Sequence, residues 1–247
     1  MSFSGKTAEQ LLEQAQNAED RDRRVQALNS TAQMLFDEAY MTGDDTRAVN
    51  FAEEVFAPEI QGLYTGRETG SDLEYWREEV SGLDRESGVF HVPATESAPY
   101  DYLRSCMEVV EEEYDQVVGV HSGGLAPVYA VEDIFEADAV VLRYSHRDRA
   151  DEDVQVTPEM EERADFEGSD VLVLDDVVES GETFRQVGEY IMERGANSVD
   201  AVPVRTSMWD VSHDSEMLDL VNGGKKYGIV DYEREKDYSD EGLSLAR

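Results

Sequence analysis

The stretch that decides the fold spans residues 171–183 and reads VLVLDDVVESGET. Four apolar residues lead into the adjacent carboxylates Asp175 and Asp176, and a turn with one glycine and two hydroxyl side chains follows. Residues 184–194 then have the pattern of a helix. This order predicts a buried strand with two acids at its carboxyl edge, where open α/β sheets bind ligands. Because free amides at a helix N-terminus bind phosphate, a phosphorylated sugar with Mg²⁺ is an expected ligand.

Three other interpretations of this stretch can be weighed. A Walker B strand also ends in two acids, but the candidate phosphate loop at residues 4–7 lacks the upstream glycine and a preceding strand. A response-regulator receiver begins with a similar strand, but only 71 of the 247 residues follow Asp176, too few for the rest of that domain. An ordinary strand–helix unit would leave the Ser-Gly-x-Thr turn at residues 180–183 unexplained.

Residues 175–183 resemble the signature for 5-phosphoribosyl-1-pyrophosphate (PRPP) of the type I phosphoribosyltransferases. In that family a hydrophobic strand, two acids and two apolar residues precede a loop of the form acid-Thr-Gly-x-Thr. Two residues depart from it: Glu179 stands where the purine enzymes usually carry Asp, and Glu182 adds a negative charge beside the supposed phosphate loop. The resemblance implies that PRPP is bound by Asp175, Asp176, Glu179, Ser180, Gly181, Glu182 and Thr183.

Two further positions extend the resemblance. Ser122, Gly123 and Gly124 follow an apolar strand and look like the family's pyrophosphate loop, in which glycine lets backbone amides approach the ligand. Arg143 ends the next strand, where the family places a basic residue that faces pyrophosphate. By itself, Ser-Gly-Gly is as typical of a simple turn as of a pyrophosphate loop. A lone Arg is usually a surface charge.

The resemblance implies Mg²⁺-dependent transfer of the ribose 5-phosphate of PRPP to a nitrogenous base, with release of pyrophosphate. Asp175 and Asp176 would hold the ribose hydroxyls directly or through the metal. Glu179 would exchange a proton with the base, and Arg143 would neutralise the leaving group. Two alternatives stay open: a non-catalytic PRPP-sensing regulator, and an interaction protein whose site is degenerate because Glu179 and Glu182 abolish PRPP binding.

A purine, more specifically a 6-oxopurine, is the favoured base. Arg205 stands near the point where the hypoxanthine-guanine enzymes carry a Lys that contacts the base oxygen. Residues 227–232 resemble their later segment, in which an aromatic ring stacks on the base and an acid contacts its edge, so Tyr232 and Asp231 are the candidates. A surface charge at Arg205 and a packing role for Tyr232 are equally consistent with the sequence.

The composition limits the possible partners. The net charge is −36, from 57 acidic and 21 basic residues, which disfavours nucleic acid and anionic membranes. Apolar residues make up 40% of the chain, more than disorder allows. An acid-coated folded protein suits a cytoplasm of very high salt, where the Debye length is about 3 Å at 1 M, and so indicates a halophilic archaeon. No signal peptide or membrane span is evident, so we expect a cytoplasmic protein. We expect its fold to loosen at low salt, where the acidic residues repel one another. A homodimer is the expected assembly.

Alternating strand and helix patterns predict an α/β fold: a mostly parallel sheet with helices on both faces, plus an N-terminal helical extension. Apolar periodicity predicts helices over residues 7–41, 46–57 and 72–80, and the polar residues 145–168 are expected to form a long loop that closes over the site. The expected divisions are residues 1–98, a hood or oligomer contact; residues 99–206, the core; and residues 207–247, part of the base site.

Overall fold

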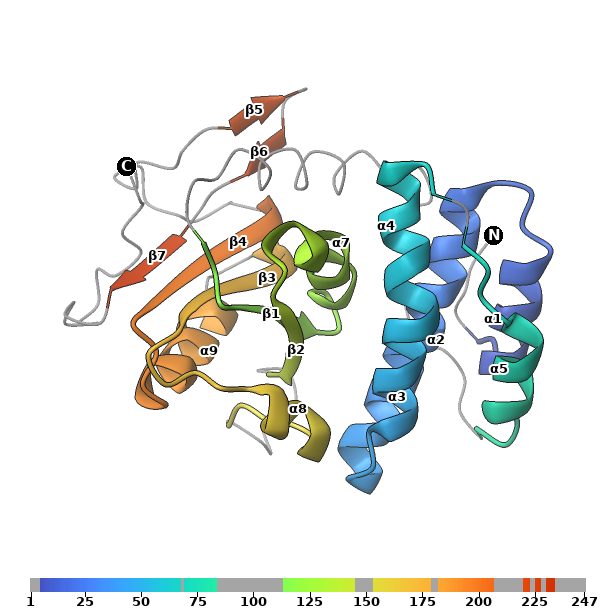
Figure 1. The fold of residues 1–247 in the computed structure, drawn as a ribbon, viewed down its shortest axis with the longest axis horizontal. Coiled ribbons are helices and arrows are strands. Elements are labelled where there is room, and N and C mark those ends of the chain that lie inside the picture. Colours follow the sequence, from blue (N-terminus) through green and yellow to red (C-terminus); the bar gives the residue numbers. More distant parts are fainter. Residues whose placement is uncertain are drawn as a thin grey trace. The chain divides into compact units, whose positions relative to one another are not determined.

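The protein is described here by a computed structural model, which covers residues 5–67, 69–83, 113–144, 153–178, 182–206, 220–222, 225–227 and 230–233. The chain divides into two compact units. Unit 1 consists of Met1–Arg104 with Thr157–Glu159, and unit 2 consists of Ser105–Val156 with Met160–Arg247 (Figure 1).

Unit 1 is helical. Its elements are α1 (Ala8–Gln16), α2 (Arg21–Thr42), α3 (Thr46–Phe51), the π-helical turn η1 (Ala52–Phe56), α4 (Ala57–Thr65) and α5 (Leu73–Glu79). The prediction of one helix over residues 7–41 was wrong, because the chain breaks after Gln16 and Asp20 caps α2 by accepting the N–H of Arg23 at 2.8 Å. Helical structure continues from Thr46 to Thr65, and the π-helical turn precedes Pro58, which has no N–H for the regular ladder.

The interior of unit 1 is mainly apolar, but among the described residues it includes the buried carboxylates of Asp45 and Glu59. Phe51, Phe56 and Ile60 are fully buried, and Phe51 meets Trp76 edge-on with 5.1 Å between ring centroids. Arg24 donates to Glu59 at 2.5 Å and so ties α2 to α4; the Glu59 side chain is only 1% exposed. Because a lone buried carboxylate is costly, Arg24 is the partner that allows Glu59 to lie there.

Unit 2 is built on a five-stranded sheet in the order β2-β1-β3-β4-β7. Its strands are β1 (Gln116–His121), β2 (Asp138–Arg143), β3 (Asp170–Val178), β4 (Ser198–Thr206) and β7 (Val230–Glu233). The first four in this order are parallel and β7 is antiparallel; β5 (Leu220–Asn222) and β6 (Lys225–Tyr227) form a separate pair. The predicted α/β class with a mostly parallel sheet is confirmed.

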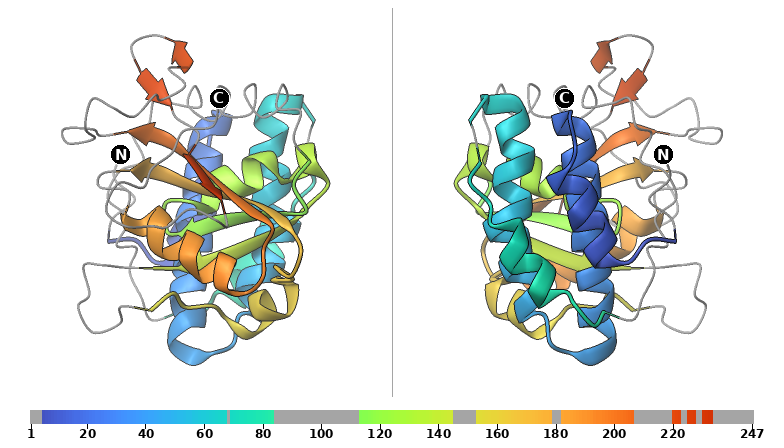
Figure 2. Two further views of the ribbon diagram at one scale, coloured as in Figure 1. Left: turned by 90° about the vertical axis from the view of Figure 1, so that its left-hand side faces the viewer. Right: turned by 90° about the vertical axis from the view of Figure 1, so that its right-hand side faces the viewer.

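Two helices cover the sheet on opposite faces. Helix α7 (Leu125–Phe135) connects β1 to β2, and α9 (Glu182–Glu193) connects β3 to β4. From β1 to β2 the chain moves toward one edge of the sheet, and from β3 to β4 it moves toward the other edge. Two right-handed crossovers therefore place α7 and α9 on opposite faces (Figure 2). Both faces of β3 are therefore covered, which explains why its residues 171–174 are all buried and all apolar.

The prediction of a long loop over residues 145–168 was wrong for the described residues 153–168. Helix α8 (Pro158–Arg163) forms there, and Met160 and Phe166 are buried. Gln155 and Arg143 exchange two backbone hydrogen bonds, of 2.9 and 2.8 Å, so the segment returns to the end of β2. Burial of Met160 and Phe166 anchors their part of the segment in unit 2. Residues 145–152 lie outside the described part, as do residues 84–112.

Across the described ranges, no helix combines the length and the apolar character needed to cross a membrane.

Candidate active site

The switch in strand order falls between β1 and β3, which are adjacent and parallel. Open α/β sheets bind ligands outside the carboxyl ends of the strands at such a point. Here β1 ends at His121 and continues into Ser122, Gly123 and Gly124, while Asp175 and Asp176 lie just beyond Leu174, which pairs with Gly119. The topology thus brings together the glycine turn and the acid pair, which are about fifty residues apart in the sequence.

The glycine turn packs directly against the two acids. A Cβ at Gly123 would overlap carboxylate oxygens of both Asp175 and Asp176 and would lie 2.6 Å from Asp176 Cγ. A Cβ at Gly124 would overlap the Leu174 carbonyl oxygen and the Val120 nitrogen. Both positions therefore require glycine for close approach rather than for an unusual φ. The peptide bond between His121 and Ser122 is cis.

The acid pair is electrostatically unfavourable when both members are charged. The Asp176 N–H donates to Asp175 Oδ1 at 2.8 Å, which holds the first carboxylate beside the second. Burial raises the pKa of Asp175 well above its ordinary value, and the adjacent charge of Asp176 raises that pKa further. The described residues contain no cluster of three or more His, Cys, Asp or Glu side chains with metal-site geometry. Two carboxylates suit Mg²⁺ when a bound phosphorylated ligand supplies the other oxygens.

The raised pKa predicts a stability effect with a definite sign. The native Asp175 holds its proton to higher pH than the unfolded one, so its contribution to the free energy of unfolding is present below pH 3.8 and is lost as pH rises through the native pKa. We therefore expect Asp175→Asn to stabilise the metal-free protein at pH 7, with no gain near pH 3.5. Urea unfolding of both proteins against pH, in molar KCl with chelator, measures the difference; a gain independent of pH would contradict this cause.

The carboxyl ends of β1 and β2 place His121 and Arg143 beside the turn. Arg143 ends β2 in register with His121 at the end of β1. Side chains at registered positions of parallel strands lie on the same face of the sheet, so these two are neighbours. Arg143 is partly exposed and His121 is buried. His121 was not among the predicted site residues; its position immediately before the Ser-Gly-Gly turn was the signal that could have indicated it.

Glu182 does not stand as an isolated charge at the start of α9. Its carboxylate accepts two hydrogen bonds from Arg185, at 3.0 Å from Nε and 2.5 Å from Nη2, and one from Gln186 Nε2 at 2.9 Å. Thr183, in the same first turn, is partly exposed. The predicted site residues Glu179, Ser180 and Gly181 lie outside the described residues.

The three predicted base-binding residues are not brought together by the backbone. Arg205 is near the end of β4, in register with Val177 of β3. Asp231 and Tyr232 of β7 pair with Asp200 and Val199, at the start of β4. Arg205 follows Asp200 by five positions along β4, about 16 Å at the usual rise. The base assignment therefore stays a prediction, and Arg205 is the member of the three that lies toward the carboxyl edge with the acid pair.

Comparison with known proteins bears on this arrangement. Residues 96–216 match the model of the phosphoribosyl transferase domain. The matched segment includes the acid pair, the glycine turn, Arg143 and Arg205. No curated protein sequence matches the chain.

The solved structures that resemble the chain include three phosphoribosyltransferases, each at low sequence identity and low TM-score. The purine phosphoribosyltransferase of Pyrococcus horikoshii Ot3 is 20% identical with a TM-score of 0.32, covering 44% of this chain and 68% of that one. A hypoxanthine phosphoribosyltransferase of Staphylococcus aureus is 18% identical with a TM-score of 0.33, covering 42% of this chain and 61% of that one. A phosphoribosyltransferase of Corynebacterium diphtheriae is 18% identical with a TM-score of 0.27, covering 61% and 78%. At these scores the likeness carries no weight for function.

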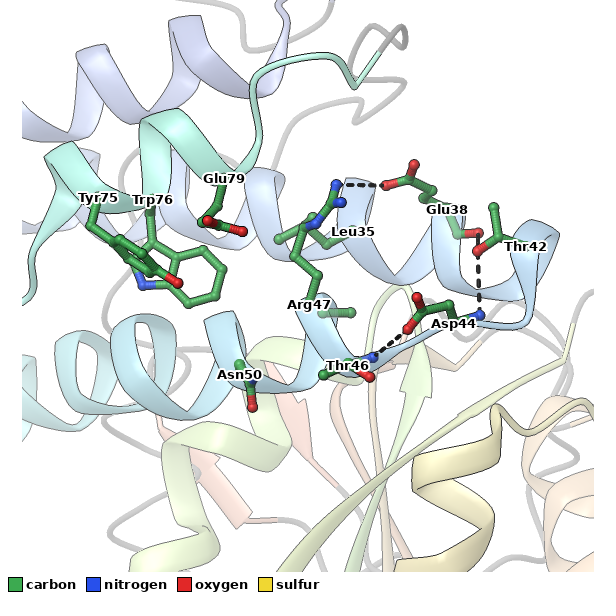
Figure 3. Close-up of a pocket in the computed structure, with 11 residues that line it drawn as sticks. Leu35, Glu38, Thr42, Asp44, Thr46, Arg47, Asn50, Tyr75, Trp76 and Glu79 are labelled. Atoms are coloured by element: carbon green, nitrogen blue, oxygen red, sulfur yellow. Dashed lines mark hydrogen bonds and ion pairs between the residues drawn. The ribbon is translucent and has the colours of Figure 1, made fainter.

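Unit 1 contains a separate pocket of about 370 Å³, between α2, α3 and α5 (Figure 3). None of the predicted site residues lines it. Three of its charged groups have structural partners: Arg47 pairs with Glu38 at 3.6 Å, and Asp44 Oδ1 accepts the N–H of Thr46 at 3.3 Å. The pocket therefore contains none of the residues for which the sequence predicts chemistry.

Proposed function

We propose that this chain is a phosphoribosyltransferase, which transfers the ribose 5-phosphate of PRPP to a nitrogenous base and releases pyrophosphate. The observation that supports this most strongly is the acid pair packed on the glycine turn at the switch point of the sheet. That arrangement lies within the segment that matches the phosphoribosyl transferase domain.

The acid pair suits the sugar. Carboxylates of Asp175 and Asp176 accept hydrogen bonds from two vicinal ribose hydroxyls and stabilise positive charge that develops on the ring as the leaving group departs. They are also the proposed ligands of Mg²⁺, which when bound neutralises charge on pyrophosphate and supplies a further positive centre. Burial, and after it the adjacent charge of Asp176, raise the pKa of Asp175, and a cation bound between the carboxylates would offset the repulsion.

The glycine turn and the end of β2 suit the leaving group. With no side chains at Gly123 and Gly124, backbone amides of the turn can approach pyrophosphate closely. Arg143 supplies a permanent positive charge at the same edge of the sheet. The 5-phosphate is proposed to bind the segment of residues 180–183 at the start of α9, and Glu179 to exchange a proton with the base.

The proposed acceptor is a 6-oxopurine, supported by the place of Arg205 toward the carboxyl edge. We expect turnover with hypoxanthine or guanine when the chain is incubated with PRPP and Mg²⁺ in molar KCl, against adenine, xanthine, uracil and orotate. Nucleotide formation followed by chromatography measures it. Turnover of orotate or uracil alone would refute the purine assignment and keep the family. Tight PRPP binding without turnover of any base would favour the sensing regulator instead.

The proposed setting follows from charge. A net charge of −36 suits a cytoplasm of high salt, as in a halophilic archaeon, with the protein acting as a homodimer. Within it, residues 1–98 would serve as hood or oligomer contact and residues 207–247 would contribute to the base site.

A further inference from the structure

We infer that the pocket of unit 1, between α2, α3 and α5, is a binding site for a small organic cation of the alkylated ammonium class (Figure 3). Its volume of about 370 Å³ lies within the usual range for small-molecule sites, about 300–1,000 Å³. This site is independent of the proposed function, because none of the residues that line the pocket belongs to the candidate active site.

Aromatic side chains form one wall of the pocket. Tyr75 is 50% exposed and is one of two large apolar side chains exposed in the described part of the chain, whereas its neighbour Trp76 is buried. The Tyr75 ring meets the Trp76 ring edge-on with 5.5 Å between centroids, and Trp76 in turn packs on Phe51. These contacts restrict the Tyr75 ring, so the wall is already formed before a ligand binds. An exposed ring held in this way can attract a cation to its negative face.

The charged groups of the lining leave the pocket negative. Three carboxylates, those of Glu38, Asp44 and Glu79, face one guanidinium, that of Arg47. Arg47 is directed toward Glu38, whereas none of the ion pairs formed among the described residues involves Glu79 (Figure 3). Glu79 follows Tyr75 by four positions, so the two side chains lie on the same face of α5. A carboxylate and an exposed ring therefore stand together on one side of the pocket.

This combination of groups decides the class of ligand. An anion would meet the excess of negative charge in the lining. A bare metal ion needs several converging oxygens, and the described residues contain no cluster of three or more His, Cys, Asp or Glu side chains that could hold one. An alkylated ammonium group suits both features, because its alkyl carbons contact the Tyr75 ring while the Glu79 carboxylate balances its charge.

Trp76 provides a reporter for the pocket. The chain has two tryptophans, Trp76 and Trp209, so Trp209→Phe leaves Trp76 as the only one. This full-length variant is titrated in about 1 M KCl with choline and with the uncharged analogue of choline in which carbon replaces the nitrogen. We expect choline to change the Trp76 fluorescence saturably, with one site per chain and a dissociation constant in roughly the millimolar range. The uncharged analogue should bind at least about tenfold more weakly, because it lacks the charge that Glu79 balances.

Substitutions in the same background test the two groups separately. We expect Glu79→Gln and Tyr75→Leu each to weaken choline binding about three- to tenfold, the range for one partly exposed charge or cation–π contact. Tyr75→Phe keeps the ring and should bind choline within about twofold of its parent. Glu78→Gln is the matched control, since it removes the same charge from the adjacent exposed position of α5 and does not line the pocket. It should leave the affinity unchanged, and circular dichroism checks that every variant is folded.

Several results would overturn the assignment. They are a response to choline that does not saturate, and equal affinity for the uncharged analogue, which would mean that the pocket recognises apolar groups alone. Equal weakening by Glu78→Gln and Glu79→Gln would mean that choline is attracted by the acidic surface as a whole. The same saturable response to KCl alone would assign the pocket to a bare cation. Because these titrations contain no PRPP, their failure leaves the proposed function standing, and failure of PRPP to bind leaves the pocket assignment standing.

Discussion

Asp175→Asn combined with Asp176→Asn is expected to abolish Mg²⁺-dependent PRPP binding. It should also lower kcat/KM by about a thousandfold or more, the usual effect of removing groups that stabilise charge in a transition state. The amides cannot hold a divalent cation as the carboxylates do, and they carry no negative charge toward the ribose. Titration of PRPP with and without Mg²⁺, in molar KCl, measures the binding, and product formation measures the rate.

The fold should survive this double substitution, because removing adjacent charges from a half-buried position relieves repulsion. Asp138→Asn is the matched control: Asp138 is exposed and begins β2, at the opposite edge of the sheet from the acid pair. It should leave both affinity and rate unchanged. PRPP affinity that stays at the wild-type value in the double variant would show that the site lies elsewhere.

Gly124→Ala is expected to destabilise the protein by about 2–3 kcal/mol, in the upper range for overpacking, because its methyl group would meet backbone atoms of two strands. Neither the Leu174 carbonyl nor the Val120 nitrogen can move without disturbing the pairing of β1 and β3. Urea unfolding in molar KCl measures the change. Gly70→Ala is the control, since nothing lies within 4 Å of its added methyl group, and it should be neutral or slightly stabilising.

Gly123→Ala tests whether the glycine turn positions the acid pair. Its methyl group would meet the ends of the Asp175 and Asp176 side chains, which can rotate away at smaller cost than backbone. The expected result is therefore a smaller loss of stability than in Gly124→Ala but a loss of at least about tenfold in affinity for Mg²⁺ and PRPP together. Equal stability losses with unchanged affinity would mean that the turn does not position the acids.

Several features of the fold could be predicted because they depend on short-range pattern. The run of apolar residues 171–174 specifies a strand covered on both faces, and the acids that follow it must then lie at its carboxyl end. An apolar strand was likewise expected before the Ser-Gly-Gly turn, and β1 (Gln116–His121) forms there. The break at residues 17–20 was missed because seven-residue periodicity continues across it, while the capping bond of Asp20 is set by a single side chain. The order of residues 153–168 was missed because it depends on the burial of Met160 and Phe166 by distant elements.

The sequence by itself determined the α/β class and the acid pair at a strand end, because the apolar run and the two carboxylates stand within one strand–loop–helix unit. Only the tertiary structure decided that Gly123 packs on both acids and that His121 lies beside Arg143. Those contacts depend on which strands become neighbours and in what register, and strand pairing is fixed by burial of the whole sheet rather than by any local pattern. The ion pair of Arg185 with Glu182 depends on both the sequence and the fold. The spacing of three residues is visible in the sequence, but the rotamers that bring the two side chains together are decided in the folded chain.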